Sequence, residues 1–190
     1  MIQIRIHGRG GQGVVTAAEL IALAAFNEGR YAQAFPLFGV ERSGAPIQSF
    51  VRLDDKPINN REQIYEPDIL IIQDDSLLNS VDVLVGAKKN TKIIVNSSLS
   101  AKEIYQIIKK SSKNKGLITE KNIFITPATA IAIEIFKKNL ANAPLLGALA
   151  RYSQLISLAS IKKAMENKFS GKGQAVVSQN IQAALKAFSI

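Results

Sequence analysis

Residues 2–26 read IQIRIHGRGGQGVVTAAELIALAAF. The pattern predicts a β-strand over residues 2–7, a glycine-rich turn over residues 8–13, and a helix over residues 14–26. We call residues 8–13 the glycine turn. Its glycines allow positive φ angles and bring the start of the helix close to whatever lies above the strand. Because unpaired N–H groups and the positive end of the helix dipole meet there, the turn is an expected anion-binding position.

The glycine turn fits the G-x-G-x-x-G pattern in its required context, directly after a strand and at the start of a helix. A dinucleotide fingerprint would add a carboxylate about 20 residues later, and residues 31–36 hold none. A P-loop would add G-K-[ST], which is also missing here. Three uses therefore stay open: contact with a phosphate or another anion, tight packing at an interface, and binding of a dinucleotide by a stand-alone protein. The candidate binding residues are Gly8, Arg9, Gly10, Gly11, Gln12 and Gly13.

The composition predicts a globular protein. A chain of 190 residues is long enough to bury a full core as one domain. Its residues are 47% hydrophobic and 21% charged, and no apolar run is long enough for a membrane span. The sequence begins with a core strand rather than a basic leader, so a cytoplasmic location is the default expectation.

The sequence contains no cysteine and one histidine, His7. It therefore offers no disulfide, no thiolate nucleophile and no thiolate ligand for zinc or an iron–sulfur cluster. A catalytic triad or a multi-histidine metal site would have to use His7. Its place at the end of the first strand suits an active site, but a structural role with a hydrogen bond is the favoured interpretation.

The net charge of +9 is unevenly distributed along the chain. Residues 1–95 carry 10 basic and 11 acidic side chains, whereas residues 96–190 carry 14 basic and 4 acidic ones. A solvated lysine face explains this excess, and an acidic protein partner is the alternative. Nucleic-acid binding is disfavoured, because the lysines are scattered and lack clustered arginine or interleaved aromatic residues.

The rest of the chain alternates predicted strands and helices and then becomes helical. The strand at residues 69–72 is continuously apolar, which is typical of a strand covered on both faces. We therefore expect a three-layer α/β/α single domain over residues 1–190, with a glycine-rich first βα turn and a helical C-terminal region. The other predicted strands are at 30–35, 47–53, 93–96 and 123–125, and the helices at 77–85, 101–110, 126–138, 143–157, 160–169 and 174–188.

Three polar or irregular segments interrupt this pattern. Asp74 and Asp75 follow the strand at 69–72; they could bind a metal, but capping is favoured, with Asp75 or Ser76 as the N-cap of the next helix. Residues 111–116 form a polar loop that we expect to be mobile. Residues 36–46 hold two prolines, two glycines and exposed apolar side chains that need a cover, so we interpret them as an interface element.

Four stretches resemble the gamma subunits, or gamma-type domains, of 2-oxoacid:ferredoxin oxidoreductases, most closely those of pyruvate:ferredoxin oxidoreductase. They are HGRGGQG at 7–13, YAQAFPLFGVERSGAP at 31–46, EPD at 66–68 and NAPLLG at 142–147. The second stretch is the most specific because it is long and unusual. Ser43 departs from the family pattern, in which many relatives have arginine.

The resemblance implies a non-catalytic subunit of a larger enzyme. Such enzymes convert pyruvate, coenzyme A and oxidised ferredoxin to acetyl-CoA, carbon dioxide and reduced ferredoxin, and branched-chain 2-oxoacids such as 2-oxoisovalerate are the rival substrates. Thiamine diphosphate, Mg²⁺ and the [4Fe-4S] clusters are expected on the alpha, beta and delta subunits, with no cofactor or metal in this chain. Coenzyme A is expected to contact the glycine turn, helped by Arg9. The expected interface residues are Leu37, Phe38, Val40, Glu41, Arg42 and Asn142.

Overall fold

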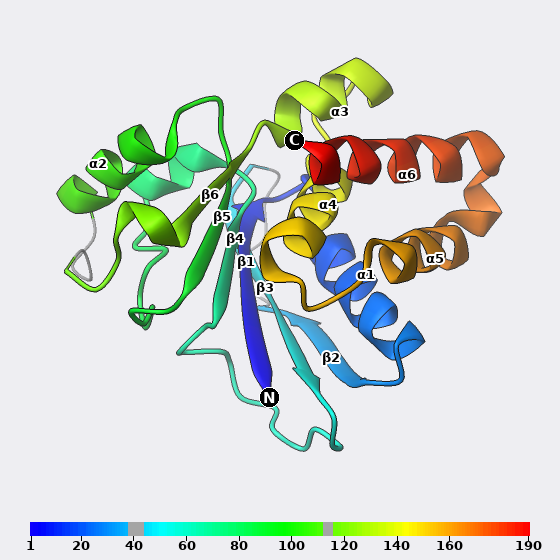
Figure 1. Ribbon diagram of the computed structural model, residues 1–190, viewed down its shortest axis with the longest axis horizontal. Helices are drawn as coiled ribbons and strands as arrows, with labels where there is room; N and C mark the ends of the chain where they lie inside the picture. The colour runs from blue at the N-terminus through cyan, green and yellow to red at the C-terminus, as the bar shows by residue number, and fades with distance from the viewer. Residues whose placement is uncertain (38–43, 112–115) are drawn as a thin grey trace.

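The computed structural model describes residues 1–37, 44–111 and 116–190 and contains a six-stranded sheet flanked by helices (Figure 1). The strands are β1 (Ile2–Arg9), β2 (Tyr31–Pro36), β3 (Pro46–Asp54), β4 (Ile69–Ile72), β5 (Lys92–Asn96) and β6 (Ile123–Thr126). The α-helices are α1 (Val14–Asn27), α2 (Ala101–Ser111), α3 (Ala128–Phe136), α4 (Asn142–Ser153), α5 (Leu158–Phe169) and α6 (Gln174–Ser189). Three short 3₁₀ helices are η1 (Asp75–Asn79), η2 (Glu120–Asn122) and η3 (Ser170–Lys172).

The sheet is mixed, in the order β2-β3-β1-β4-β5-β6. Strands β1, β4, β5 and β6 run parallel to one another, whereas β3 pairs antiparallel with both β1 and β2. The carboxyl ends of the four parallel strands therefore lie along one edge, which faces upward in Figure 1. We call this the carboxyl edge. In open α/β sheets, this is the edge at which ligands bind.

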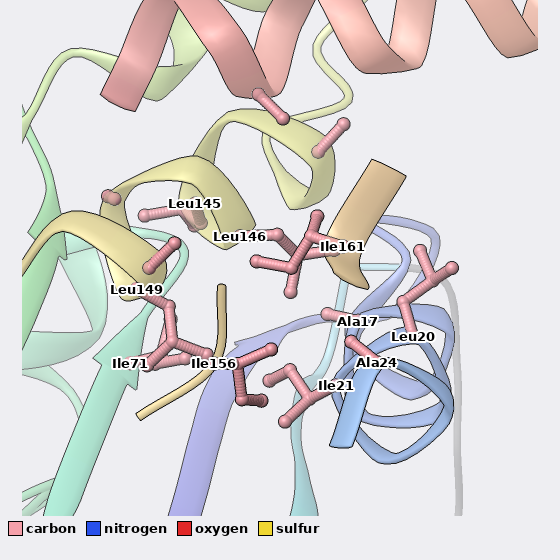
Figure 2. Close-up of a cluster of buried hydrophobic side chains, with 14 of the residues drawn as sticks. Ala17, Leu20, Ile21, Ala24, Ile71, Leu145, Leu146, Leu149, Ile156 and Ile161 are labelled. Atoms are coloured by element: carbon pink, nitrogen blue, oxygen red, sulfur yellow. The ribbon is translucent and has the colours of Figure 1, made fainter. Parts of the chain in front are cut away.

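Helices α1, α4, α5 and α6 cover one face of the sheet, and α2 and η1 cover part of the other (Figure 1). Figure 2 shows the core of the first face, where α1, α4 and α5 meet β4 around Ile21, Leu146 and Ile71. Alternate residues of β4 enter opposite cores: Ile69 and Ile71 pack on the first face, Leu70 and Ile72 on the second. The continuous apolar strand is thus covered on both faces, and the expected three-layer α/β architecture is confirmed.

Two buried arginines organise the second face where it has no helical cover. Arg5 of β1 donates to the carbonyl oxygens of Ile64 (3.2 Å), Val83 (3.0 Å) and Val85 (2.6 Å). Arg52 of β3, which is fully buried, donates to backbone carbonyl groups of residues 60, 62 and 63. These side chains hold irregular chain segments against the sheet, because buried carbonyl groups need a donor.

The structure corrects several predicted boundaries. The helix predicted at 77–85 is wrong: η1 ends at Asn79, and the carbonyl groups of Val83 and Val85 accept hydrogen bonds from Arg5 instead of from a following helical turn. The N-cap of η1 is Asp74, not Asp75 or Ser76, because the Asp74 carboxylate accepts from the Ser76 N–H.

The C-terminal helices also begin or end elsewhere than predicted. Helix α4 ends at Ser153 rather than at residue 157, since Gln154 adopts a left-handed conformation with φ of 57°. Helix α5 begins at Leu158 rather than at residue 160, capped by the Ser157 side chain. Of the loop predicted to be mobile, residues 112–115 lie outside the described residues. No helix in the described part of the chain has the length and apolar character needed to cross a membrane.

Candidate functional site

The glycine turn sits at the carboxyl edge, between β1 and α1. Gly11 and Gly13 adopt left-handed conformations with φ of 91° and 75°, and Gly13 is the N-cap of α1. No described side chain caps this helix, and Ala17 is the residue whose N–H bonds to the Gly13 carbonyl. The N–H groups of the first turn of α1 are thus left without an intrahelical acceptor, as expected at a helix start. The backbone at this position can receive an anion.

Asp74 follows β4, the strand beside β1, and its side chain contacts the glycine turn. Its Oδ2 accepts hydrogen bonds from Arg9 Nε (3.1 Å) and Gln12 Nε2 (2.9 Å). Arg9 also donates to Ser76 Oγ (2.7 Å) and to the Gly44 carbonyl (3.1 Å). Burial acts to raise the pKa of Asp74, but the hydrogen bonds from Ser76 and Gln12, together with the Arg9 charge, outweigh it and lower that pKa. The Arg9 guanidinium is therefore engaged within the protein, and Asp74 stays ionised.

Asn142, another of the expected site residues, comes from the C-terminal half of the chain and lies beside the glycine turn. Asn142, the first residue of α4, is 8% exposed, and its Nδ2 lies 3.0 Å from the position that a Cβ on Gly13 would occupy. Stretches 7–13 and 142–147 of the sequence are thus neighbours in space. The interface role expected of Asn142 stays a prediction.

The predicted interface element, residues 36–46, is described only at its two ends. Leu37 is half-buried and its N–H donates to the Gln48 carbonyl (3.0 Å). Gly44 and Ala45 form backbone hydrogen bonds with Gly10 of the glycine turn, at 3.1 and 2.9 Å. The other expected interface residues of this loop lie outside the described residues: Phe38, Val40, Glu41 and Arg42.

His7 is buried and hydrogen-bonded, as the favoured interpretation expected, and its purely structural role stays a prediction. It is 4% exposed, and its Nε2 accepts a hydrogen bond from Arg5 Nε at 3.0 Å. Burial, with a smaller contribution from the Arg5 charge, lowers the pKa of His7 to about 3. Near neutral pH the imidazole of His7 is therefore uncharged in the folded chain.

A polar cleft of about 430 Å³, not predicted from the sequence, lies at the carboxyl ends of β4, β5 and β6. Among its lining residues, Gln73 is 1% exposed, and both polar atoms of its carboxamide are buried without a hydrogen-bond partner in the described part of the chain. A signal was available, since a polar residue closes or follows each of these strands: Gln73, Asn96 and Thr126. The cleft is lined by Gln12, Gln73, Asp74, Asp75, Asn96, Ser97, Ser98, Pro127, Thr129, Ala130, Ile133 and Asn139.

Asp75 and Asp74 both line this cleft, but their carboxylates have different partners. Asp75 Oδ2 accepts from Ser97 Oγ at 2.5 Å, while Asp74 points to the glycine turn. No group of three acidic, histidine or cysteine side chains that could hold a metal ion occurs in the described residues.

The sequence over residues 3–190 matches the family model described as pyruvate ferredoxin/flavodoxin oxidoreductase. The chain belongs to this family. It is 47% identical over 189 residues to the pyruvate/ketoisovalerate oxidoreductases common subunit gamma of Thermococcus kodakarensis, covering 100% of this chain and 96% of that protein. It is 42% identical over 189 residues to the pyruvate synthase subunit PorC of Methanocaldococcus jannaschii, with the same coverage.

Solved structures agree with this assignment. The pyruvate oxidoreductase subunit PORC of Thermotoga maritima superposes with a TM-score of 0.82 at 31% identity, over 99% of this chain and 95% of that one. The 2-oxoglutarate:ferredoxin oxidoreductase of Magnetococcus marinus shares the fold, with a TM-score of 0.74 at 22% identity, over 99% of this chain and 30% of that one. This chain is thus a gamma-type subunit of a multisubunit oxidoreductase, as the resemblance implied.

Proposed function

We propose that this chain is a non-catalytic gamma subunit, one gamma-type domain over residues 1–190, that assembles with alpha, beta and delta subunits. The observation that carries this proposal is the enclosure of His7. The one histidine of the sequence is buried and neutral, and the sequence has no cysteine. The two side chains most often used for proton transfer and covalent catalysis at neutral pH are therefore not available. We expect His7→Gln to leave kcat of the assembled enzyme unchanged.

The cofactors then belong to the partner subunits. A [4Fe-4S] cluster is held by cysteine thiolates, which this sequence cannot supply. We assign thiamine diphosphate, Mg²⁺ and the clusters to the alpha, beta and delta subunits, and ferredoxin to the assembled enzyme as electron acceptor. We also propose that the enzyme assembles in the cytoplasm.

Pyruvate is the proposed substrate of the assembly, with 2-oxoisovalerate as the second candidate. The second candidate is favoured by a specific observation: the Thermococcus kodakarensis relative is named as common to pyruvate and ketoisovalerate oxidoreductases. A gamma chain without catalytic groups could serve both enzymes, because the 2-oxoacid would be selected by other subunits.

We further propose that the glycine turn contacts coenzyme A through its backbone. The uncapped start of α1, with Gly11 and Gly13 in left-handed conformations, supports a phosphate contact. The Magnetococcus marinus enzyme, which contains this fold, is described with coenzyme A bound. Since Arg9 is engaged by Asp74, Ser76 and Gly44, we assign Arg9 to shaping the turn and the uncapped N–H groups at the start of α1 to the phosphate.

The Michaelis constant for coenzyme A of the assembled enzyme tests this contact. Gly11→Ala should raise it by about tenfold, the size expected for losing one hydrogen bond to a charged group. Gly29→Ala is a matched control: Gly29 also has a positive φ, of 77°, and open space around it, but lies after the other end of α1. Equal constants for both variants in an intact complex would contradict the contact.

A further inference from the structure

Strand β2 forms one end of the sheet, and among the described residues no strand lies on its outer side (Figure 1). We call this outer side the β2 edge. Its sequence, YAQAFP, has no charged residue, and its one proline is the last residue. Strand edges are ordinarily protected by charged side chains, bulges or a covering segment, because their unpaired backbone groups attract another strand. The β2 edge has no charge of its own to prevent such pairing.

Two alanines carry the free backbone groups of the β2 edge. The Leu37 N–H, just after the strand, donates to the Gln48 carbonyl of β3 (3.0 Å). Backbone groups alternate between the two sides of an antiparallel strand, so every second residue back from Leu37 also bonds to β3. The N–H and carbonyl groups of Ala32 and Ala34 therefore point away from β3.

The free donors of the β2 edge are limited to these two residues. On the same side of the strand, the Arg30 N–H is already used, since it bonds to the Ala25 carbonyl (3.1 Å). At the other end, Pro36 has no N–H. The outward donors are thus the N–H groups of Ala32 and Ala34 alone.

The β2 edge complements a second copy of itself in one antiparallel register. When Gln33 lies opposite Gln33 of the second copy, Ala32 of each copy lies opposite Ala34 of the other. All four outward donors of the two edges then meet a carbonyl acceptor. A register shifted by two residues would place an alanine opposite Arg30 or Pro36, which offers no free N–H.

The side chains on the second face of the sheet suit the same register. Tyr31 is 50% exposed and would come opposite Phe35 of the second copy, and aromatic cross-strand pairs stabilise antiparallel sheets. The Gln33 carboxamide accepts from Arg52 (3.2 Å) through Oε1, which leaves its N–H groups for the Gln33 carboxamide of the second copy.

The first face of the β2 edge adds an apolar surface. Ala32 and Ala34 line a groove of about 370 Å³ against α1, together with Phe26, which is 71% exposed. The two charged residues of this groove, Glu19 and Lys168, form an ion pair (2.7 Å) and neutralise each other. In a symmetric pair the two grooves would adjoin across the joined strands, so both copies would lose exposed apolar surface.

We infer that two copies of this chain pair through the β2 edge, antiparallel about Gln33, and join their sheets into one continuous sheet. The second copy is the occupant that the edge specifies, because one sequence supplies both halves of each cross-strand pair. This contact uses the side of the sheet rather than the carboxyl edge. It goes beyond the proposed function and does not depend on the other subunits.

Sedimentation equilibrium of the full chain over roughly 1–200 μM tests the pairing. The wild type should form dimers, and Ala34→Pro should weaken their association at least about tenfold, because it removes two of the four hydrogen bonds. Proline is accepted at an edge position whose N–H faces outward, so the melting temperature should stay within about 4 °C of the wild type. Ala34→Ser keeps the N–H and is the matched control. A monomeric wild type, or an Ala34→Pro dimer as stable as the wild-type dimer, would overturn the inference.

A single introduced cysteine tests the register, because the sequence has none of its own. Residue 33 would face its own copy at a Cα–Cα distance of about 4.5 Å, which suits a disulfide. Gln33→Cys should therefore form a disulfide-linked dimer with a mild oxidant. Tyr31→Cys is the matched control on the same face of β2: its two copies would lie about 13 Å apart and should not cross-link. Equal cross-linking of the two variants, or none in either, would overturn the inference.

The assembled enzyme distinguishes a second copy from another subunit. Residues 32–34 should be protected from hydrogen exchange there, and Gln33→Cys should still cross-link two copies of this chain. Protection without this cross-link would assign the β2 edge to a strand of another subunit and overturn the inference. Failure of the chain to join the alpha, beta and delta subunits would contradict the proposed function alone, because the dimer is measured on the free chain.

Discussion

At the scale of single residues, His7 makes the stability of the chain depend on pH. Its pKa falls from an ordinary 6.5 to about 3 on folding, so below pH 6.5 the unfolded chain binds a proton that the folded chain does not. The free energy of unfolding should therefore be constant above pH 6.5 and fall by about 1.4 kcal/mol per pH unit well below it. Urea unfolding between pH 7 and 5 measures this slope, above the range in which carboxylates titrate.

The matched variant is His7→Gln, whose carboxamide oxygen can still accept from Arg5. It should remove most of the slope between pH 6.5 and 5 while leaving the chain folded. If the variant and the wild type lose stability in parallel over this interval, the assignment of the slope to His7 is wrong.

Asp74 is the residue that joins the glycine turn to the sheet. Asp74→Asn should lower the free energy of unfolding by about 1–2 kcal/mol, because Arg9 and Gln12 lose a charged acceptor. Hydrogen exchange of residues 8–13 should become faster in the same variant. Asp55→Asn is the control, since the Asp55 side chain is 89% exposed and its ion pair with Arg30 should contribute less than about 1 kcal/mol. Equal losses in the two variants would contradict the bracing role of Asp74.

At the scale of secondary-structure elements, α4 and α6 pack closely because of Gly147. A Cβ at this position would lie 2.0 Å from the carbonyl oxygen of Ala184 in α6. Helix propensity alone predicts that Gly147→Ala stabilises the chain by about 1 kcal/mol, whereas packing predicts a loss of about 1–3 kcal/mol. We expect the loss, measured by urea unfolding. Gly171→Ala, with open space around it, should change the stability by less than about 0.5 kcal/mol; a stabilised Gly147→Ala variant would refute the close packing.

The sequence predicted elements well where a local pattern determines them. The strand at residues 69–72 and the helix after the glycine turn follow from apolar runs and glycine positions, and both are observed. The helix predicted at 77–85 failed because the decisive contact is not local: Arg5, about 80 residues earlier, takes the carbonyl groups of Val83 and Val85. The antiparallel insertion of β3 beside β1 was likewise not predicted, since it depends on the pairing of whole strands.

The candidate site, like the fold, was predictable only where a local sequence pattern determines it. The glycine turn is visible in the sequence because four of its six residues are glycine and its context is a strand followed by a helix. The contact that holds the turn to the sheet is not visible in the sequence, because Asp74 is 62 residues from Gln12 and resembles an ordinary capping residue. The polar cleft depends on three strands ending side by side, so only the sheet order reveals that Gln73 and Asn96 share it.

At the scale of the whole molecule, the candidate contacts with coenzyme A and other subunits that the described residues form lie along one edge of the sheet. The glycine turn, the start of α4 and the polar cleft all meet at the carboxyl edge, which faces upward in Figure 1. The buried arginines and the two apolar cores lie below this edge and explain stability rather than function. We therefore predict that the chain joins the other subunits through one continuous surface and has no reaction centre of its own.

The purification of this chain from its source organism, through a tag and in the absence of oxygen, tests that claim most directly. We predict that it brings down alpha, beta and delta subunits, identified by mass spectrometry, in a brown assembly. This assembly should reduce ferredoxin with pyruvate and coenzyme A in a thiamine-dependent reaction. A colourless chain recovered alone, under conditions that preserve other complexes, would contradict the account.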